Sequence, residues 1–114
     1  MTTNTSFKLD PNGRPYIEKT PGERLIYGLD LEAWQDSAGD TVTTATVTSG
    51  GTLIVGEGSG PLSSGAASVG AGGVTVVIGG GAVGEYAPVT FDWQTAGGQT
   101  GSRTIWLRIV AARP

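Results

Sequence analysis

Hydrophobic and polar residues alternate with a period of two through most of the last third of the chain. The alternation fills two segments, 84–99 and 104–110, and a Gly-Gly pair lies at the end of the first. The bulky residues that share a face are Val89, Phe91 and Trp93 in the first segment and Ile105, Leu107 and Ile109 in the second. A strand with one buried face shows this pattern, so the sequence predicts a long β-hairpin.

Tyr86 is one residue out of phase with Val89, Phe91 and Trp93, and Pro88 lies in the gap. This offset predicts a bulge or a strand start near Pro88, where the missing N–H is tolerated. Tyr86 also stands where immunoglobulin-like sandwiches place a corner tyrosine, whose hydroxyl bonds to backbone upstream. The alternative is an ordinary core tyrosine.

The preceding part of the chain contains further strand patterns. Residues 24–34 alternate strictly, residues 35–40 form a turn, and residues 41–48 are a β-branched run in which Val42 is out of phase with the later apolar positions. That offset predicts a twist or bulge within the run. Short strands follow at 52–55 and 74–78, and we find no segment with helical periodicity. The pattern gives six or seven short strands, and the chain contains 20 glycines, many of which lie at the turns between them. Together these features predict an all-β sandwich.

The N-terminal residues 1–22 lack this pattern because prolines and an Asn-Gly pair interrupt it. We expect an extended arm over 1–22 and a single sandwich domain over 23–114. The arm is either a disordered tail or a segment that orders on a neighbouring subunit. Its apolar anchors are Phe7, Leu9, Tyr16 and Ile17. Residues 56–73 contain little except glycine, serine and alanine and predict a long flexible surface loop.

The composition excludes several kinds of chemistry. Without histidine or cysteine the chain cannot build a Ser–His–Asp or Cys–His nucleophile or the usual zinc sites. The glycine-rich stretches contain no phosphate-binding motif, and a net charge of −3 gives no footprint for nucleic acid. The clustered carboxylates Asp30, Glu32, Asp36 and Asp40 fit a solvated strand face and a turn better than a metal site or a glycosidase pair. We therefore expect no enzyme activity, no cofactor and no metal.

The N-terminus is polar, and the most apolar run, 74–78, is too short to cross a bilayer. The sequence therefore predicts a soluble protein, made in the cytoplasm, with no membrane partner.

Two features suggest surfaces for protein partners. Arg103 and Arg108 either pair across the sheet with Asp30, Glu32 or Asp92, or face an acidic partner. Trp106 lies on the face opposite Ile105 and Leu107, so it is either covered by the arm or presented to a partner. The complete set of interface candidates is Phe7, Leu9, Tyr16, Ile17, Trp34, Arg103, Trp106 and Arg108.

Four segments of the chain resemble a family of small virion proteins of tailed phages, the fiber-tail adaptor proteins. The segments are Tyr27-Gly28-Leu29-Asp30-Leu31-Glu32-Ala33-Trp34, Gly39-Asp40-Thr41-Val42, Gly79-Gly80-Gly81-Ala82-Val83-Gly84-Glu85-Tyr86, and Thr95-Ala96-Gly97-Gly98-Gln99-Thr100-Gly101-Ser102-Arg103-Thr104-Ile105. The resemblance implies an immunoglobulin-like β-sandwich without catalytic activity that attaches tail fibers to the tail of a short-tailed phage. It also implies a location in the virion tail. The implied partners are tail tube, nozzle or head–tail connector proteins, tail fibers, and copies of the chain itself in a symmetric ring.

Two other functions stay open from the sequence. A capsid cement or decoration protein would use similar β-modules and arms. A carbohydrate-binding module would use Trp34, Trp93 or Trp106 as a stacking platform, and it predicts glycan binding that is lost on Trp106→Ala.

Overall fold

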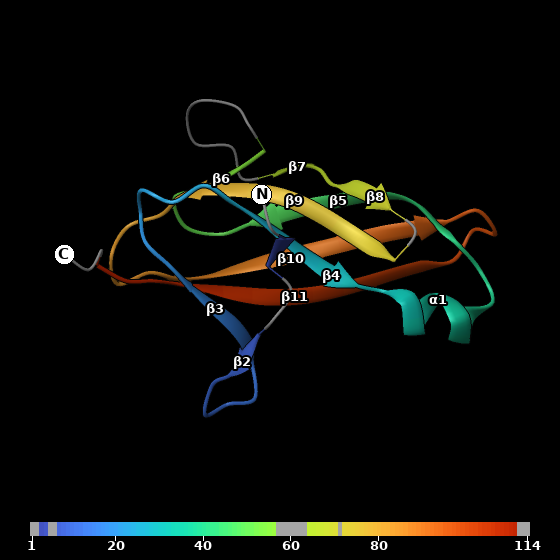
Figure 1. Ribbon diagram of the computed structural model, residues 1–114, viewed down its shortest axis with the longest axis horizontal. Helices are drawn as coiled ribbons and strands as arrows, with labels where there is room; N and C mark the ends of the chain where they lie inside the picture. Colours follow the sequence, from blue (N-terminus) through green and yellow to red (C-terminus); the bar gives the residue numbers. More distant parts are fainter. Residues whose placement is uncertain (1–2, 5–6, 57–63, 71, 112–114) are drawn as a thin grey trace.

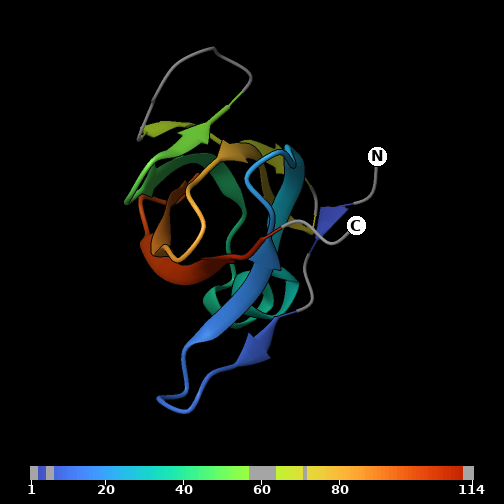
Figure 2. The same ribbon diagram turned by 90° about the vertical axis from the view of Figure 1, so that its left-hand side faces the viewer.

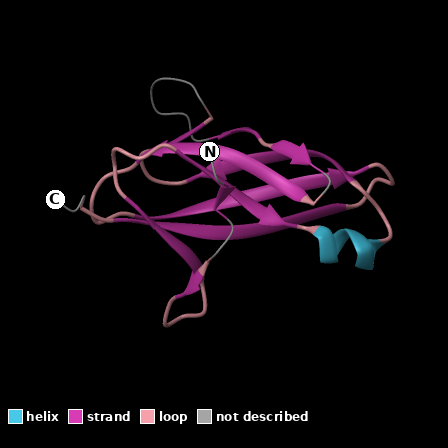
Figure 3. Cartoon of the chain, viewed as in Figure 1, coloured by secondary structure: helices cyan, strands magenta, loops and turns pink. Residues whose placement is uncertain are grey.

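The computed structural model describes residues 3–4, 7–56, 64–70 and 72–111, which form two packed β-sheets with one short helix at one end (Figures 1 and 3). The five-stranded sheet has the order β1 (Thr3–Asn4), β4 (Leu25–Asp30), β9 (Gly73–Gly80) and β6 (Leu53–Val55), and β8 (Ser68–Gly70) also pairs with β9. The six-stranded sheet has the order β2 (Lys8–Leu9), β3 (Pro15–Lys19), β11 (Thr100–Ile109), β10 (Tyr86–Thr95), β5 (Val42–Ser49) and β7 (Ser64–Ala66). The predicted all-β sandwich is confirmed.

The core lies between the sheets and is built by the period-two pattern. In β10 the buried residues are Ala87, Val89, Phe91, Trp93 and Thr95, and in β11 they are Ile105, Leu107 and Ile109. The opposite sheet contributes Tyr27, Leu29, Leu53, Val55, Val74, Val76 and Ile78. Each large apolar side chain buried in this way stabilises the fold by about 1.5–3 kcal/mol relative to exposure.

The predicted hairpin is confirmed as β10 and β11, which pair without interruption from Tyr86 opposite Arg108 to Gln94 opposite Thr100. Of the two features predicted near Pro88, the strand start is confirmed, since β10 begins at Tyr86, and the bulge is wrong, because Tyr86 and Pro88 are not displaced members of the inner face. They stand on the outer face of the sheet, and the inner face begins at Ala87. Pro88 is tolerated beside β5 because it lies just past the end of that strand, where Gly50 donates its N–H to the Pro88 carbonyl at 2.9 Å.

The irregularity predicted within 41–48 is confirmed. Val42 pairs with Thr95 and Thr44 pairs with Gln94, so Thr43 is an extra residue in β5. The bulge lets Val42 point into the core although it is out of phase with Ala45 and Val47.

The strand expected over residues 24–34 ends early, and the expectation of no helix is wrong. β4 stops at Asp30, and α1 (Glu32–Ala38) follows in place of the predicted turn. The inward positions Leu31, Trp34, Gln35 and Ala38 have the spacing of one helical face, a signal that the strand pattern before it hides. Gly39 ends the helix with a left-handed φ of 66°.

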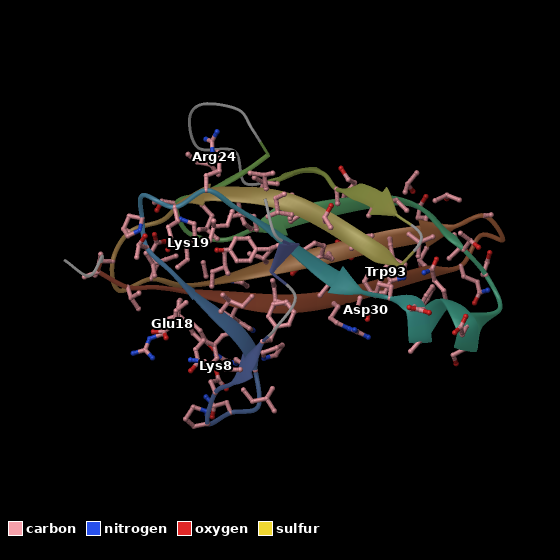
Figure 4. The ribbon with its side chains drawn as sticks, in the orientation of Figure 1. Lys8, Glu18, Lys19, Arg24, Asp30 and Trp93 are labelled. Atoms are coloured by element: carbon pink, nitrogen blue, oxygen red, sulfur yellow. The ribbon has the colours of Figure 1, made fainter. Side chains whose placement is uncertain are left out.

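The segment expected to be an arm contributes strands to both sheets of its own chain. β3 pairs in parallel with β11, β2 pairs with β3, and β1 pairs in parallel with β4. Lys19, at the end of β3, is only 1% exposed and donates to the carbonyls of Thr20 at 2.8 Å and Gly80 at 2.6 Å. Figure 4 shows its side chain directed into the body of the sandwich. Viewed from the end, the β2–β3 hairpin projects away from the sandwich (Figure 2).

The loop expected over 56–73 is partly structured. β7 and β8 fall within it and pair with β5 and β9 respectively. The prediction of a loop for residues 57–63 and 71 lies outside the described residues.

Trp93 fills the end of the core nearest to α1 and requires a glycine beside it. Trp34 meets its ring edge-on at 5.4 Å, and Gly101 lies directly opposite it across the β10–β11 pair. A Cβ atom at position 101 would overlap the indole ring. The glycine in this strand is therefore explained by the close approach of an aromatic ring.

We predict that Gly101→Ala lowers the free energy of unfolding by about 1–3 kcal/mol, because the added methyl group overpacks against Trp93. Urea unfolding followed by tryptophan fluorescence measures the change. Gly22→Ala is the matched control, since nothing lies within 4 Å of its Cβ position and its φ is not positive. Equal urea midpoints for Gly101→Ala and Gly22→Ala would show that the close contact between position 101 and Trp93 does not exclude a larger side chain.

Candidate functional site

Three aromatic side chains from three strands meet on the outer face of the six-stranded sheet. Tyr16 of β3, Tyr86 of β10 and Trp106 of β11 form this group, which we call the aromatic cluster. Tyr86 stacks on Trp106 with ring centroids 5.1 Å apart, and Tyr16 meets Tyr86 edge-on at 6.2 Å. The strand register produces the cluster, because Trp106 lies opposite Tyr16 on one side and Pro88 on the other.

The turn of the β2–β3 hairpin is pinned onto this cluster. The Arg14 guanidinium lies over the Trp106 ring, 4.8 Å from its centroid, in cation–π geometry. The Tyr86 hydroxyl donates to Asp10 Oδ2 at 2.6 Å, while Asp10 Oδ1 accepts from the N–H groups of Asn12 and Arg14, each at 2.8 Å. Asp10 thus closes its own turn and fastens it to the sheet.

These contacts shift the acidities of both partners. The hydrogen bond from Tyr86 lowers the pKa of Asp10, and the backbone donors of Arg14 and Asn12 lower it further. Partial burial, together with the hydrogen bond to the Asp10 carboxylate, raises the pKa of Tyr86 to about 12. Near neutral pH the pair is therefore a neutral phenol donating to a carboxylate.

An open groove of about 560 Å³ lies between the hairpin turn and the end of the β10–β11 pair. Its lining comprises Asp10, Pro11, Tyr16, Val83, Gly84, Glu85, Tyr86, Arg108, Ile109, Val110 and Ala111. Val83 is 60% exposed and Arg108 is also exposed, so the groove offers an apolar and a cationic group to solvent. A concave surface that combines apolar and charged groups in this way suits the binding of a ligand or partner.

The structure brings together only some of the predicted interface residues. Tyr16 and Trp106 belong to the aromatic cluster and Arg108 lines the groove, while Leu9, on the neighbouring β2, is 72% exposed. Trp106 is covered by Tyr86 and Arg14 rather than presented freely.

The other candidates lie elsewhere. Phe7, Ile17 and Trp34 pack against the core, and Arg103 is exposed on β11 away from the groove. Within the described part of the chain, neither Arg103 nor Arg108 forms an ion pair with Asp30, Glu32 or Asp92. Lys8 and Glu18 form an ion pair at 3.9 Å on the β2–β3 hairpin, and Figure 4 shows the two residues next to each other.

Tyr86 does not form the corner motif considered from the sequence. Its hydroxyl bonds to the side chain of Asp10, and not to upstream backbone, so that prediction is wrong. Asp10 and Arg14 are the site residues that sequence reasoning missed. The turn signal of Asp10-Pro11-Asn12-Gly13 was available, but nothing local indicates that the turn docks on β10 and β11.

Two further carboxylates tie loops together at the ends of the sandwich. Asp40 Oδ2 accepts from the Thr95 hydroxyl at 2.7 Å and from Gln99 Nε2 at 3.1 Å, and Asp40 Oδ1 accepts from the Thr41 N–H at 2.9 Å. These bonds join the segment after α1 to the β10–β11 turn.

Glu85 does the same at the groove end. Its carboxylate accepts from the Thr52 hydroxyl at 2.6 Å, the Thr52 N–H at 3.1 Å and the Ala82 N–H at 2.5 Å. The hydrogen bonds from Thr95 and Thr52 are the main reason that the pKa of Asp40 and of Glu85 is lowered. The carboxylates in these loops are thus used for structure.

The described residues contain no group of three or more histidine, cysteine, aspartate or glutamate side chains arranged to hold a metal ion. Among the same residues, no helix is long and apolar enough to cross a membrane.

The chain matches the model of a known protein family over most of its length. The family described as podophage GP4 fiber-tail adaptor protein gp77 matches residues 19–108, which include β10, β11 as far as Arg108, the groove residues from Val83 to Arg108, and both Asp40 and Glu85. The groove residues Asp10, Pro11 and Tyr16 lie before the matched range. No curated protein and no solved structure matches the chain.

We predict that the protein loses stability on acidification, and that Asp40→Asn reduces this loss. Because the pKa of Asp40 is lower in the folded state than its ordinary value of 3.8, its contribution is complete above that value and disappears as the pH falls through the lowered pKa. Thermal unfolding between pH 7 and pH 2.5 measures the effect. Wild type should melt above Asp40→Asn at pH 7, and the two should converge at the acid end. A difference in melting temperature between wild type and Asp40→Asn that stays constant from pH 7 to pH 2.5 would contradict the prediction.

We predict that Tyr86→Phe loosens the hairpin turn while the sandwich stays folded. The phenylalanine ring keeps the stacking on Trp106 but cannot donate to Asp10. Hydrogen exchange of the Asn12 and Arg14 amides should accelerate several-fold, because the acceptor that holds them loses its anchor. Tyr27→Phe is the control, since the buried Tyr27 hydroxyl has no hydrogen-bond partner within the described residues. Unchanged exchange in Tyr86→Phe would mean that the cation–π contact alone fixes the turn.

Proposed function

We propose that this chain, which belongs to the podophage GP4 fiber-tail adaptor protein family, attaches tail fibers to the tail of a short-tailed phage by protein–protein contacts. Several copies act together in a ring around the tail, with tail tube, nozzle or connector proteins on one side and fibers on the other. The role is structural and involves no catalysis, so the relevant chemistry is that of surfaces.

The observation that supports this proposal most is the groove beside the aromatic cluster. An adaptor needs a surface that is rigid before its partner arrives, because ordering a segment on binding costs affinity. Here Asp10, Arg14 and Tyr86 fix the hairpin that forms one wall of the groove. In a ring, a modest contact of this kind is repeated by symmetry and becomes a strong attachment.

The alternative of a carbohydrate-binding module is not favoured by the tryptophans. Stacking on a sugar requires an accessible ring face, but Trp93 is 2% exposed and Trp34 packs against it. Trp106 has Tyr86 and Arg14 against it. No tryptophan among the described residues therefore offers an open platform.

We predict that the protein is present in purified phage particles at a copy number on the order of ten, as a tail ring with cyclic symmetry requires. Quantitative mass spectrometry, with the major capsid protein as internal standard, measures this number. Particles from which the tails have been removed serve as the control and should lack the protein.

Other outcomes separate the remaining functions. A copy number close to that of the capsid protein would place the chain in the shell as a cement protein. Absence from particles would contradict any structural role in the virion.

A further inference from the structure

Two kinds of charged group line the groove: carboxylates that already accept hydrogen bonds within the chain, and an arginine that has no ion-pair partner among the described residues. Both carboxylates are already occupied by donors of the same chain: Asp10 by Tyr86 and two backbone N–H groups, and Glu85 by Thr52 and Ala82. Each of them already accepts three hydrogen bonds, so most of its acceptor capacity is used within the chain. Both carboxylates in the groove therefore serve mainly to hold turns of the fold in place.

Arg108 is the opposite case. It lies opposite Tyr86 on one side and opposite Glu18 on the other, yet the Glu18 carboxylate forms its ion pair with Lys8. The Arg108 side chain is exposed and has no ion-pair partner in the described part of the chain. Its guanidinium is free to bind a carboxylate in a bidentate manner.

The rest of the groove is largely apolar. Val83 is one of the two large hydrophobic side chains that are strongly exposed among the described residues, and Pro11, Tyr86 and Val110 line the same space. An exposed aliphatic side chain beside an aromatic wall gains stability when another aliphatic group covers it. A volume of about 560 Å³ accommodates a few side chains of an extended segment but not a broad flat surface.

From this combination we infer that the groove binds an extended segment of the tail fiber in which an aliphatic side chain stands next to an aspartate or glutamate. The aliphatic side chain packs on Val83 and the wall of the aromatic cluster, and the carboxylate pairs with Arg108. This inference rests on the proposed adaptor function and adds to it the chemistry of the partner and the residues that recognise it. The narrow, open shape of the groove suits an extended segment better than a broad flat surface, and the tail is therefore the second probe of the experiment below.

Arg103 provides a matched control for Arg108. Both arginines are exposed, both lie on β11, and neither forms an ion pair in the described residues. Only Arg108 lines the groove. A comparison of the same substitution at the two positions therefore separates a local contact from a general effect of net charge.

The experiment uses the full-length protein, immobilised, with the purified fiber of the same phage as the first probe and purified tails lacking adaptor and fibers as the second. Arg108→Glu should weaken fiber binding at least tenfold, since it replaces a charge-assisted pair by repulsion. Arg103→Glu should stay within about twofold of wild type, because the distance to the groove screens its charge. Val83→Asp should also weaken fiber binding, and binding to tails should be unchanged in all three variants.

The outcomes are distinguishable. Circular dichroism and thermal unfolding establish that each variant is folded, and Val83→Asp provides a second test if Arg108→Glu is unstable, because Val83 lies in an exposed loop. Normal fiber binding by both groove variants would overturn the inference while leaving the adaptor function intact. Loss of tail binding with retained fiber binding would also overturn it, because the groove would then face the tail. Failure of the wild type to bind the fiber would overturn the proposed function itself, and the inference with it.

Discussion

Three carboxylates, Asp10, Asp40 and Glu85, hold together the parts of this sandwich that apolar packing does not reach. Glycine-rich loops have few side chains to bury, but they present backbone N–H groups that need acceptors. A carboxylate can accept several hydrogen bonds at once, and charge-assisted bonds are the stronger ones. Asp40 joins segments that are 55 or more residues apart, and Asp10 bonds to Tyr86 across 76 positions. The turns at both ends of the long hairpin depend on such bonds.

Hydrogen bonds to these carboxylates hold in place several of the segments that resemble the adaptor family. The Gly39-Asp40-Thr41-Val42 and Thr95–Gln99 segments are distant in sequence but meet through Asp40. The glycine-rich segment that ends in Tyr86 carries Glu85, which fastens it to Thr52. In this chain the spacing of these turns is therefore also a pattern of contacts, and these contacts hold the loops at the ends of the sheets.

The parts of the fold that the sequence predicted are those governed by local periodicity. The faces of β10 and β11 follow from the alternation of bulky residues, and the bulge at Thr43 follows from its interruption. The helix α1 was missed because Leu31 and Ala33 continue the alternating pattern of residues 24–34, so that a strand period and a helix period overlap there. β3 was missed because its parallel partner β11 is distant in sequence, and residues 15–19 carry no sign of that pairing.

In the candidate site too, the sequence predicts local features such as the face of a strand, but not contacts between residues that are distant in sequence. The sequence placed Trp106 on the outer face of its strand and left two possibilities, cover by the arm or exposure to a partner. The first is confirmed, because Arg14 of the segment 1–22 lies over the ring, but the sequence did not show which arm residue does so. This cover depends on Arg14 and Asp10, in a turn whose docking position is set by the β3–β11 pairing. The ion pairing around Arg108 likewise depends on distant contacts, since Glu18, which lies opposite Arg108, is paired with Lys8 on the β2–β3 hairpin.

The docking of the hairpin on its own chain changes the energetics of assembly. An arm that ordered only on a neighbour would lose backbone entropy at about 1–2 kcal/mol per residue at the moment of binding. In this structure β2 and β3 are ordered by their own sheet, by the aromatic cluster and by Lys19, so folding has already met that cost. A partner then meets a preformed groove, and its affinity depends on the few groups left exposed there. Among the described residues that line the groove, Asp10 and Glu85 already accept hydrogen bonds within the chain, so Arg108 and the apolar and aromatic side chains are the groups left for the recognition that we propose.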